Sequence, residues 1–342
     1  MAGDCIRQIP RRGFVLSLAA TILMMAAASA PSLFYPQIAE RLGLIPVATT
    51  LVFAVYTFTL LAALLYLGPL SDHVGRRPVV AAGSLALALS VAMFWFAGSL
   101  AALLVARALQ GLAAGLLIPA LSAMMIDFES PSHRNIAALW NTIGPMIGLG
   151  AGALGAALLL DLTSEPTTAV FGSLVLAFLI VATVVWSTPE LAPKTQIRRG
   201  DLRPRFTVPP HLRRMFTAGV PVIIAGWATN GLFLALGADL VGSELGGSTH
   251  TQAGIVLFAL AISGVTASSV LQRRSARTIS LYATSALAFG TAVSIGALAL
   301  GSYPAYVASV AIVGSGFGTA FLGVLRTLMP HTASSERAAV MA

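Results

Sequence analysis

A short charged stretch between two long apolar runs carries the residues best suited to polar chemistry. In GPLSDHVGRRP, residues 68–78, Asp72 is followed four and five positions later by Arg76 and Arg77. A carboxylate beside guanidinium groups makes charge-assisted hydrogen bonds, which can hold one conformation of a moving bundle. We therefore predict a conformational latch made of Gly68, Asp72, Gly75, Arg76, Arg77 and, as an acidic partner for Arg76, Asp127.

A second set of polar residues lies inside apolar runs. A charged side chain at membrane depth costs about 2.5–3.5 kcal/mol on insertion scales, so such residues are commonly functional. We predict a substrate or ion cavity lined by Arg107, Gln110, Asn141, Trp227 and Asn230. The alternatives are that Arg107 bonds to backbone carbonyls or reaches toward the surface, and that the other polar groups hold neighbouring helices together.

The apolar run from Ile136 contains small residues at four-residue spacing and a proline. Such spacing favours close packing between helices, and a proline inside a helix kinks it. We predict that helix packing and a kink in this run depend on Gly144, Pro145, Gly148 and Gly152.

Several kinds of chemistry have no residues to perform them. No Asp or Glu lies mid-span, the His residues lie in loops without metal-ligand spacing, and Cys5 is the only cysteine. No Walker sequence is present, so ATP drive is not expected. These features argue against an enzyme, a metal or a cofactor. They disfavour proton coupling, and they suit a neutral or anionic solute better than a cation.

The composition places these residues in a membrane protein. Of the 342 residues, 57% are hydrophobic and only 9% are charged, whereas about 25% are charged in soluble domains. A membrane helix needs about 20 mostly apolar residues. Ten such runs start near Phe14, Thr50, Val79, Leu100, Ile136, Ala169, Met215, Ala253, Ile279 and Tyr303. The predicted fold class is an all-α membrane protein.

The basic residues predict how the helices are oriented. The net charge is +8, and Lys and Arg gather in alternate connections, as the positive-inside rule requires of cytoplasmic loops. These connections are the N-terminus and the loops after the second, fourth, sixth and eighth runs. We expect a multi-pass protein of the inner or plasma membrane with a cytoplasmic N-terminus, in contact with the lipid bilayer and not with nucleic acid.

The chain divides into two predicted bundles. Residues 1–187 hold six apolar runs, residues 188–214 form a basic cytoplasmic linker, and residues 215–342 hold four further runs. A shift of 200 residues aligns LSDHVGRRPVVAAGSLALA with VLQRRSARTISLYATSALA, which indicates an internal repeat. Parallel repeats of six helices are one way in which secondary transporters are built.

Three motifs resemble those of one transporter family. GPLSDHVGRRP is similar to the loop signature of the major facilitator superfamily (MFS), RALQGLAAG resembles its R-x-x-Q-G element, and GPMIGLG resembles an element of its drug/proton antiporters. The resemblance implies a bundle of two six-helix repeats, of which this chain is expected to have six helices plus an incomplete four. It also implies that Asp72 is held near the start of an eleventh helix and that Arg76 pairs with an acid at the end of the fourth.

We therefore predict transport of a small organic solute by alternating access, as an efflux transporter of the MFS type, with protons as a further candidate partner. The alternatives are a truncated member without transport activity, an uptake permease for a metabolite, and a membrane-embedded enzyme. An enzyme would need a carboxylate, histidine or metal cluster at membrane depth, which the sequence does not show.

Overall fold

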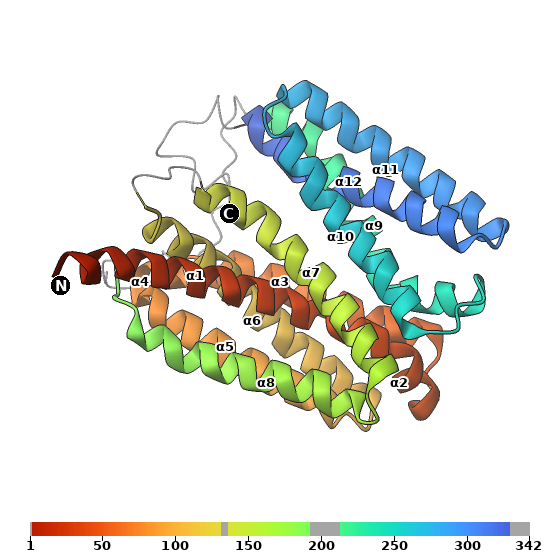
Figure 1. Cartoon of the computed structure of the whole chain (residues 1–342), viewed down its shortest axis with the longest axis horizontal. Helices are drawn as coiled ribbons and strands as arrows, with labels where there is room; N and C mark the ends of the chain where they lie inside the picture. The colour runs from red at the N-terminus through yellow and green to blue at the C-terminus, as the bar shows by residue number, and fades with distance from the viewer. Residues whose placement is uncertain (1, 131–135, 192–212, 329–342) are drawn as a thin grey trace. The chain divides into compact units, whose positions relative to one another are not determined.

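The protein is built from helices (Figure 1). The computed structural model describes residues 2–130, 136–191 and 213–328, and every regular element among them is helical. The helices are α1(Ala2–Ser29), η1(Ala30–Phe34), α2(Tyr35–Leu42), α3(Pro46–Leu67), α4(Leu70–Val74), α5(Arg76–Trp95), α6(Leu100–Asp127), α7(Ile136–Leu162), α8(Pro166–Val184), η3(Val185–Ser187), α9(Arg213–Ser243), α10(His250–Leu271), α11(Ala276–Ala299) and α12(Tyr303–Leu328).

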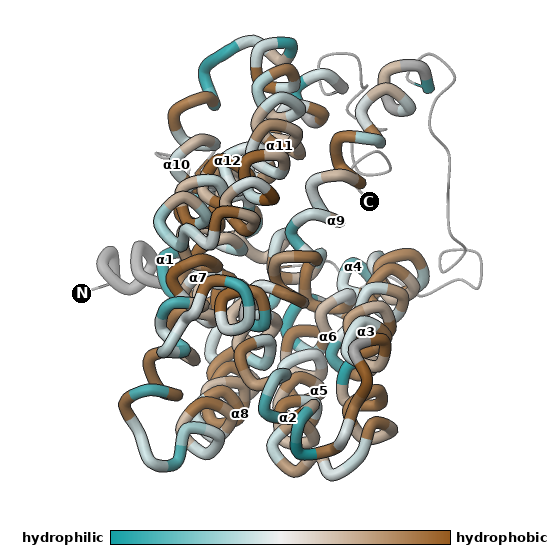
Figure 2. The backbone as a smooth tube through the Cα atoms, turned by 90° about the vertical axis from the view of Figure 1, so that its right-hand side faces the viewer, coloured by the Kyte–Doolittle hydropathy of each residue, from teal (hydrophilic) through white to brown (hydrophobic). Residues whose placement is uncertain are grey.

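The ten spans expected from the sequence are confirmed. Within the described ranges, ten helices are long and apolar enough to cross a membrane. The first span runs from Arg11 to Leu42 through α1, η1 and α2, and the sixth runs from Pro166 to Ser187 through α8 and η3, whereas α4 is a short connecting piece. Figure 2 shows hydrophobic residues along these helices and hydrophilic residues concentrated at many of their ends. The protein is therefore a multi-pass membrane protein.

Several helices begin at residues whose chemistry favours a helix start. The Ser99 hydroxyl accepts a hydrogen bond from the Ala102 amide at the start of α6, and Ser275 does the same for the Thr278 amide of α11, both at 3.2 Å. Pro46 and Pro166 open α3 and α8 at the first helical turn, where no amide proton is needed.

The chain separates into two compact units. Unit 1 comprises Met1–Gly148 and Thr163–Pro204, and unit 2 comprises Leu149–Leu162 and Arg205–Ala342. The second half of α7 therefore belongs with α9–α12, although it precedes the predicted linker in the sequence. Most of that linker, residues 192–212, lies outside the described residues, so the division at 188–214 stays a prediction.

Each unit has one central helix packed through glycines. In unit 1, α6 packs against α1, α3 and α5, and in unit 2, α12 packs against α9, α10 and α11. Any side chain at Gly111 or Gly115 of α6 would collide with the backbone of α3. Gly314 and Gly318 of α12 lie equally close to the backbone of α10. The same close contact thus occurs once in each unit, at the same four-residue spacing.

Candidate functional site

The predicted latch residues meet at one end of unit 1, where the side chain of Arg76 joins three helices. Its Nε donates to Asp127 Oδ2 at the end of α6 at 3.2 Å. Its Nη1 donates to the buried Ser71 hydroxyl of α4 at 2.7 Å and also to Asp72 Oδ1. The guanidinium therefore links the ends of α4, α5 and α6 through charge-assisted hydrogen bonds.

A residue far along the chain completes this site. The carboxylate of Glu190, just beyond η3, accepts hydrogen bonds from the Arg76 and Arg77 amides at 2.9 Å each. These amides belong to the first turn of α5, where backbone N–H groups have no partner within the helix and the helix dipole favours a negative charge. Glu190 thus caps α5 from a segment more than 100 residues away in the sequence.

Gly75 is required here for two physical reasons. Its φ of +106° lies in the region that side chains disfavour. A Cβ at this position would also lie 2.7 Å from Glu190 Oε2. Gly68, the other latch glycine, has ordinary helical angles at the end of α3.

Arg77 uses its side chain differently from Arg76. It donates to the backbone carbonyl of Trp186 in η3, and its guanidinium carbon lies 5.1 Å from the centre of the Trp186 ring. This geometry is that of a cation–π contact. The two neighbouring arginines therefore fasten the start of α5 to different partners.

The second candidate site surrounds Arg107 in α6. Its Nε donates to the Tyr35 hydroxyl at 2.6 Å, and its Nη1 donates to Gln110 Oε1 at 2.6 Å. Gln110 Nε2 in turn donates to the Ala27 carbonyl at 2.8 Å. Arg107 and Gln110 are three positions apart, so they lie on one face of α6.

Aromatic rings enclose the guanidinium of Arg107. Its central carbon lies 5.0–5.6 Å from the centres of four rings, those of Tyr35, Phe53, Tyr56 and Phe94. Arg107 is only 1% exposed, whereas we expected it to line a substrate or ion cavity. Ring faces and oxygen acceptors supply negative potential around this buried charge. A role in substrate binding stays a prediction.

The other predicted cavity residues have different contacts within their own units. Asn141 of α7 donates to the Ser122 carbonyl of α6 at 3.4 Å. In unit 2, Trp227 is 55% exposed and makes an edge-to-face contact with Phe317. Asn230 is 3% exposed, and its Oδ1 has no hydrogen-bond partner among the described residues. A common cavity for all five residues stays a prediction.

The small residues of α7 contact α1 over part of their length. A Cβ at Gly144 would lie 3.1 Å from Leu18, and one at Gly148 would collide with the backbone of Ile22. Pro145 lies inside α7, and Gly152 is half-buried one turn beyond Gly148. Two of these glycines thus permit close helix packing.

The ten spans agree with comparisons to known proteins. A sequence profile described as "Major Facilitator Superfamily" matches residues 16–342. The chain belongs to this superfamily. Among solved superfamily-like folds, a bacterial homologue of the human lysosomal transporter Spinster matches 97% of this chain and 77% of its own at TM-score 0.71 and 14% identity. The human organic anion transporter MFSD10 (TETRAN) matches 93% and 90%, at TM-score 0.61 and 18% identity.

Curated relatives are more similar in sequence over shorter regions. The puromycin resistance protein pur8 of Streptomyces alboniger is 32% identical over 42% of this MFS chain and 30% of its own length. The multidrug efflux pump LfrA of Mycolicibacterium smegmatis is 34% identical over 38% of this chain and 28% of its own. The matched regions therefore span less than a third of the length of these two relatives.

Sequence reasoning missed two partners of the latch, Glu190 and Trp186. One signal was present for Glu190: it is an acid within the basic segment 188–214, where the positive-inside rule does not call for one. No feature of the sequence indicated which helix it caps. For Trp186, a membrane-interface anchor was the ordinary interpretation.

Proposed function

We propose that this member of the superfamily exports a small neutral or anionic organic solute by alternating access. The match to the superfamily profile over residues 16–342 carries the proposal of transport. The names of the curated relatives, which include a puromycin resistance protein and a multidrug efflux pump, support efflux. The N-terminus is proposed to face the cytoplasm across an inner or plasma membrane, from the distribution of Lys and Arg.

The charge of the proposed solute rests on Arg107. Its guanidinium is buried in unit 1, and no carboxylate among the described residues forms an ion pair with it. Its Nη2 also has no hydrogen-bond partner there. An acceptor group on a solute would fill this unmet bond, and an anion would also balance the charge. A cation would be repelled at the same point.

The Arg76 network is proposed to act as the conformational latch. Its bonds to Asp72 and Asp127 join separate helix ends, and the Asp72 side chain is 61% exposed. Such contacts can open and close without disturbing the apolar core. Protons stay a further candidate partner, as expected from the resemblance to drug/proton antiporters.

Efflux of puromycin, chosen from the name of one relative, provides the first test. Cells expressing the chain should accumulate less labelled puromycin than cells with an empty vector, and a wider panel of neutral and anionic solutes follows the same protocol. Asp72→Asn should slow efflux at matched membrane levels, and Arg107→Ala should abolish solute binding to the purified protein. Glu165→Gln, which neutralises an exposed loop acid outside the latch, is the control.

If expressing cells accumulate labelled puromycin faster than cells with an empty vector, then the chain catalyses uptake and the proposal of export is wrong. Equal efflux by the wild type and Asp72→Asn would remove the latch, and normal binding by Arg107→Ala would make that arginine purely structural. If no solute of the panel moves in either direction or binds to the purified protein, the proposal of transport by this chain is wrong.

A further inference from the structure

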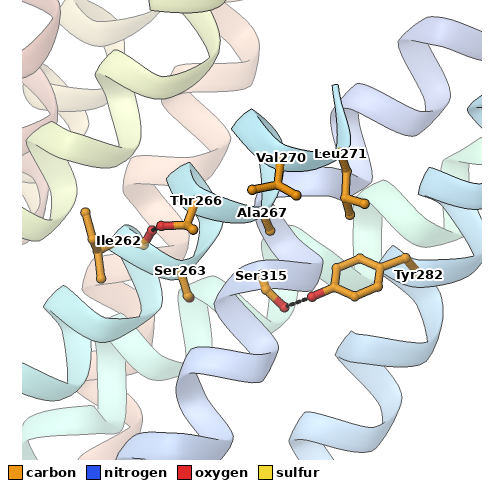
Figure 3. A pocket seen from close by; sticks show the side chains of 8 residues that line it. All are labelled: Ile262, Ser263, Thr266, Ala267, Val270, Leu271, Tyr282 and Ser315. Atoms are coloured by element: carbon orange, nitrogen blue, oxygen red, sulfur yellow. Dashed lines mark hydrogen bonds between the residues drawn. The ribbon is translucent and has the colours of Figure 1, made fainter. Parts of the chain in front are cut away.

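A groove in unit 2 lies outside everything assigned above. It runs between α10 and α11, with α12 as its floor, and has a volume of about 530 Å³ (Figure 3). Ile262, Thr266 and Val270 line it from α10, Tyr282 from α11 and Ser315 from α12. The α10 residues are four positions apart, so they form one stripe along a membrane-spanning helix.

The groove offers an apolar surface rather than hydrogen bonds. None of its lining residues is charged. The Tyr282 hydroxyl already donates to Ser315 Oγ at 2.8 Å, as Figure 3 shows, and Ser315 Oγ donates to the Ile312 carbonyl at 2.6 Å. Thr266 donates to the Ile262 carbonyl at 2.8 Å. The hydroxyl protons are therefore used within the protein, and the surface left for a ligand suits hydrocarbon.

Arginines gather at one end of this groove. Val270 and Leu271 line it, and Arg273 and Arg274 follow in the α10–α11 connection. Arg277 lies in the first turn of α11, about 7.5 Å along the helix from Tyr282 at 1.5 Å per residue. Arg326, near the end of α12, donates to the Arg274 carbonyl at 3.0 Å, which brings the fourth guanidinium to the same end.

These four arginines are exposed and have no acidic partner in the described part of the chain. The described carboxylates of unit 2 belong to Asp161, Asp239 and Glu244, near the ends of α7 and α9. Those helix ends lie at the opposite end of the bundle from the α10–α11 connection, because Asp161 bonds to the first residues of α10. Among the described residues of unit 2, the positive charge of the arginine end is therefore not balanced by a carboxylate.

We propose that this groove and its arginines bind an anionic phospholipid, with an acyl chain in the groove and the phosphate at the arginines. Basic residues placed where transmembrane helices meet the membrane surface recognise acidic headgroups. The positive-inside rule explains arginines in this connection but not an apolar groove that opens beside them. A free phosphate would use the arginines alone, and a second copy of the chain would bring no acid from the described part of this end.

Native mass spectrometry of the purified full chain tests the proposal, because it resolves lipid adducts and oligomers in one spectrum. The probes are palmitoyl-oleoyl phosphatidylglycerol, phosphatidylcholine with the same acyl chains, and glycerol 3-phosphate. We expect phosphatidylglycerol to bind at least tenfold more tightly than either other probe. Replacing Arg273, Arg274 and Arg277 by Gln should remove this preference, at about fivefold in affinity per arginine.

Two further variants separate the parts of the site. Arg7, Arg11 and Arg12 replaced together by Gln remove the same charge from the N-terminal segment, and should leave phosphatidylglycerol binding unchanged. Ala267→Phe, which narrows the groove, should weaken phosphatidylglycerol more than glycerol 3-phosphate. The Gln variant of Arg273, Arg274 and Arg277 changes exposed residues, so it tests the headgroup site even if Ala267→Phe does not fold.

Equal affinity for the two phospholipids, or full affinity in the triple Gln variant of the α10–α11 arginines, would overturn the proposal. If glycerol 3-phosphate binds as tightly as phosphatidylglycerol, then the arginines bind phosphate and no acyl chain occupies the groove, which would also contradict the proposal. Dimers that disappear in Ala267→Phe, without any lipid preference, would show that a second copy occupies the groove instead.

Discussion

Removing the carboxylate of Glu190 should loosen the start of α5. Both of its oxygens accept backbone hydrogen bonds, from Arg76 and Arg77, at 2.9 Å. Glu190→Ala leaves these two amides without their acceptor, and Glu190→Gln keeps one acceptor oxygen but loses the charge. Glu190→Gln is therefore the milder and Glu190→Ala the stronger form of the same perturbation.

The size of the effect follows from what the carboxylate supplies. Loss of a capping side chain costs about 0.5–2 kcal/mol, and loss of a negative charge at a helix N-terminus adds about 0.3–1 kcal/mol. Because Glu190 is half-buried, salt and water screen part of the charge term. We expect about 1–2 kcal/mol for Glu190→Ala, which raises the open population of this turn by roughly 5–30-fold, and about half that free energy for Glu190→Gln.

Hydrogen exchange measures this opening directly. A peptide covering residues 75–80 reports the Arg76 and Arg77 amides, and Pro78 contributes none. Its exchange should accelerate in the order wild type, Glu190→Gln, Glu190→Ala. Glu129→Ala is the matched control, since Glu129 accepts from the Ala137 amide of α7 at 2.9 Å.

Glu129→Ala should accelerate exchange at the start of α7 and leave residues 75–80 unchanged. If exchange at residues 75–80 is the same in Glu190→Ala and in the wild type, then the carboxylate does not stabilise this helix start. Acceleration of equal size in both variants at both helices would point to general loosening of the bundle, and would equally refute the local cap.

Further predictions concern the buried core, unit 2 and the topology. Tyr35→Phe removes an acceptor of the buried Arg107 guanidinium at a cost of about 1.5–3 kcal/mol, so it should lower the thermal unfolding temperature. Tyr306→Phe removes a hydroxyl without a partner among the described residues and should leave that temperature unchanged. Equal shifts of the unfolding temperature in the two variants would contradict this prediction. Asp161→Asn should accelerate exchange of the first α10 amides, because its carboxylate accepts two of them at 2.7 and 3.1 Å; unchanged rates would exclude this cap. Cysteines placed singly at Ser164 and Ser275 should be labelled from opposite sides of the membrane, and labelling from one side would overturn the span count.

Much of the fold was predictable because each membrane helix needs a long run of apolar residues, which is visible in the sequence. Ten apolar runs gave ten spans, and the loop motif with its resemblance led to the superfamily. The structure also brings Arg76 within 3.2 Å of Asp127, the partner expected for it from charge alone. These inferences needed only hydropathy, charge sign and a motif with fixed spacing.

The surroundings of Arg107 were not predictable in the same way. Its four neighbouring rings come from α2, α3 and α5. Each ring is an ordinary apolar residue in its own run, and only the packing of those helices brings the ring faces to the guanidinium. Reasoning from charge alone therefore gave no indication that aromatic rings surround this arginine.

The acidic residues show most clearly what a linear reading leaves out. The sequence has no carboxylate in the middle of a span, which argued against a carboxylate relay in the membrane. That argument assigned no role to most of the acids at the helix ends. Three of them accept backbone amides at the first turn of a helix: Glu190 at α5, Glu129 at α7 and Asp161 at α10. The first amides of a helix have no acceptor within the helix, so a carboxylate at a helix start supplies the acceptor that they lack. For Glu190 and Asp161 the capped helix lies about 90 or more residues away in the sequence. These acids therefore hold together helix ends that are distant in the sequence, and their hydrogen bonds must break if those ends separate.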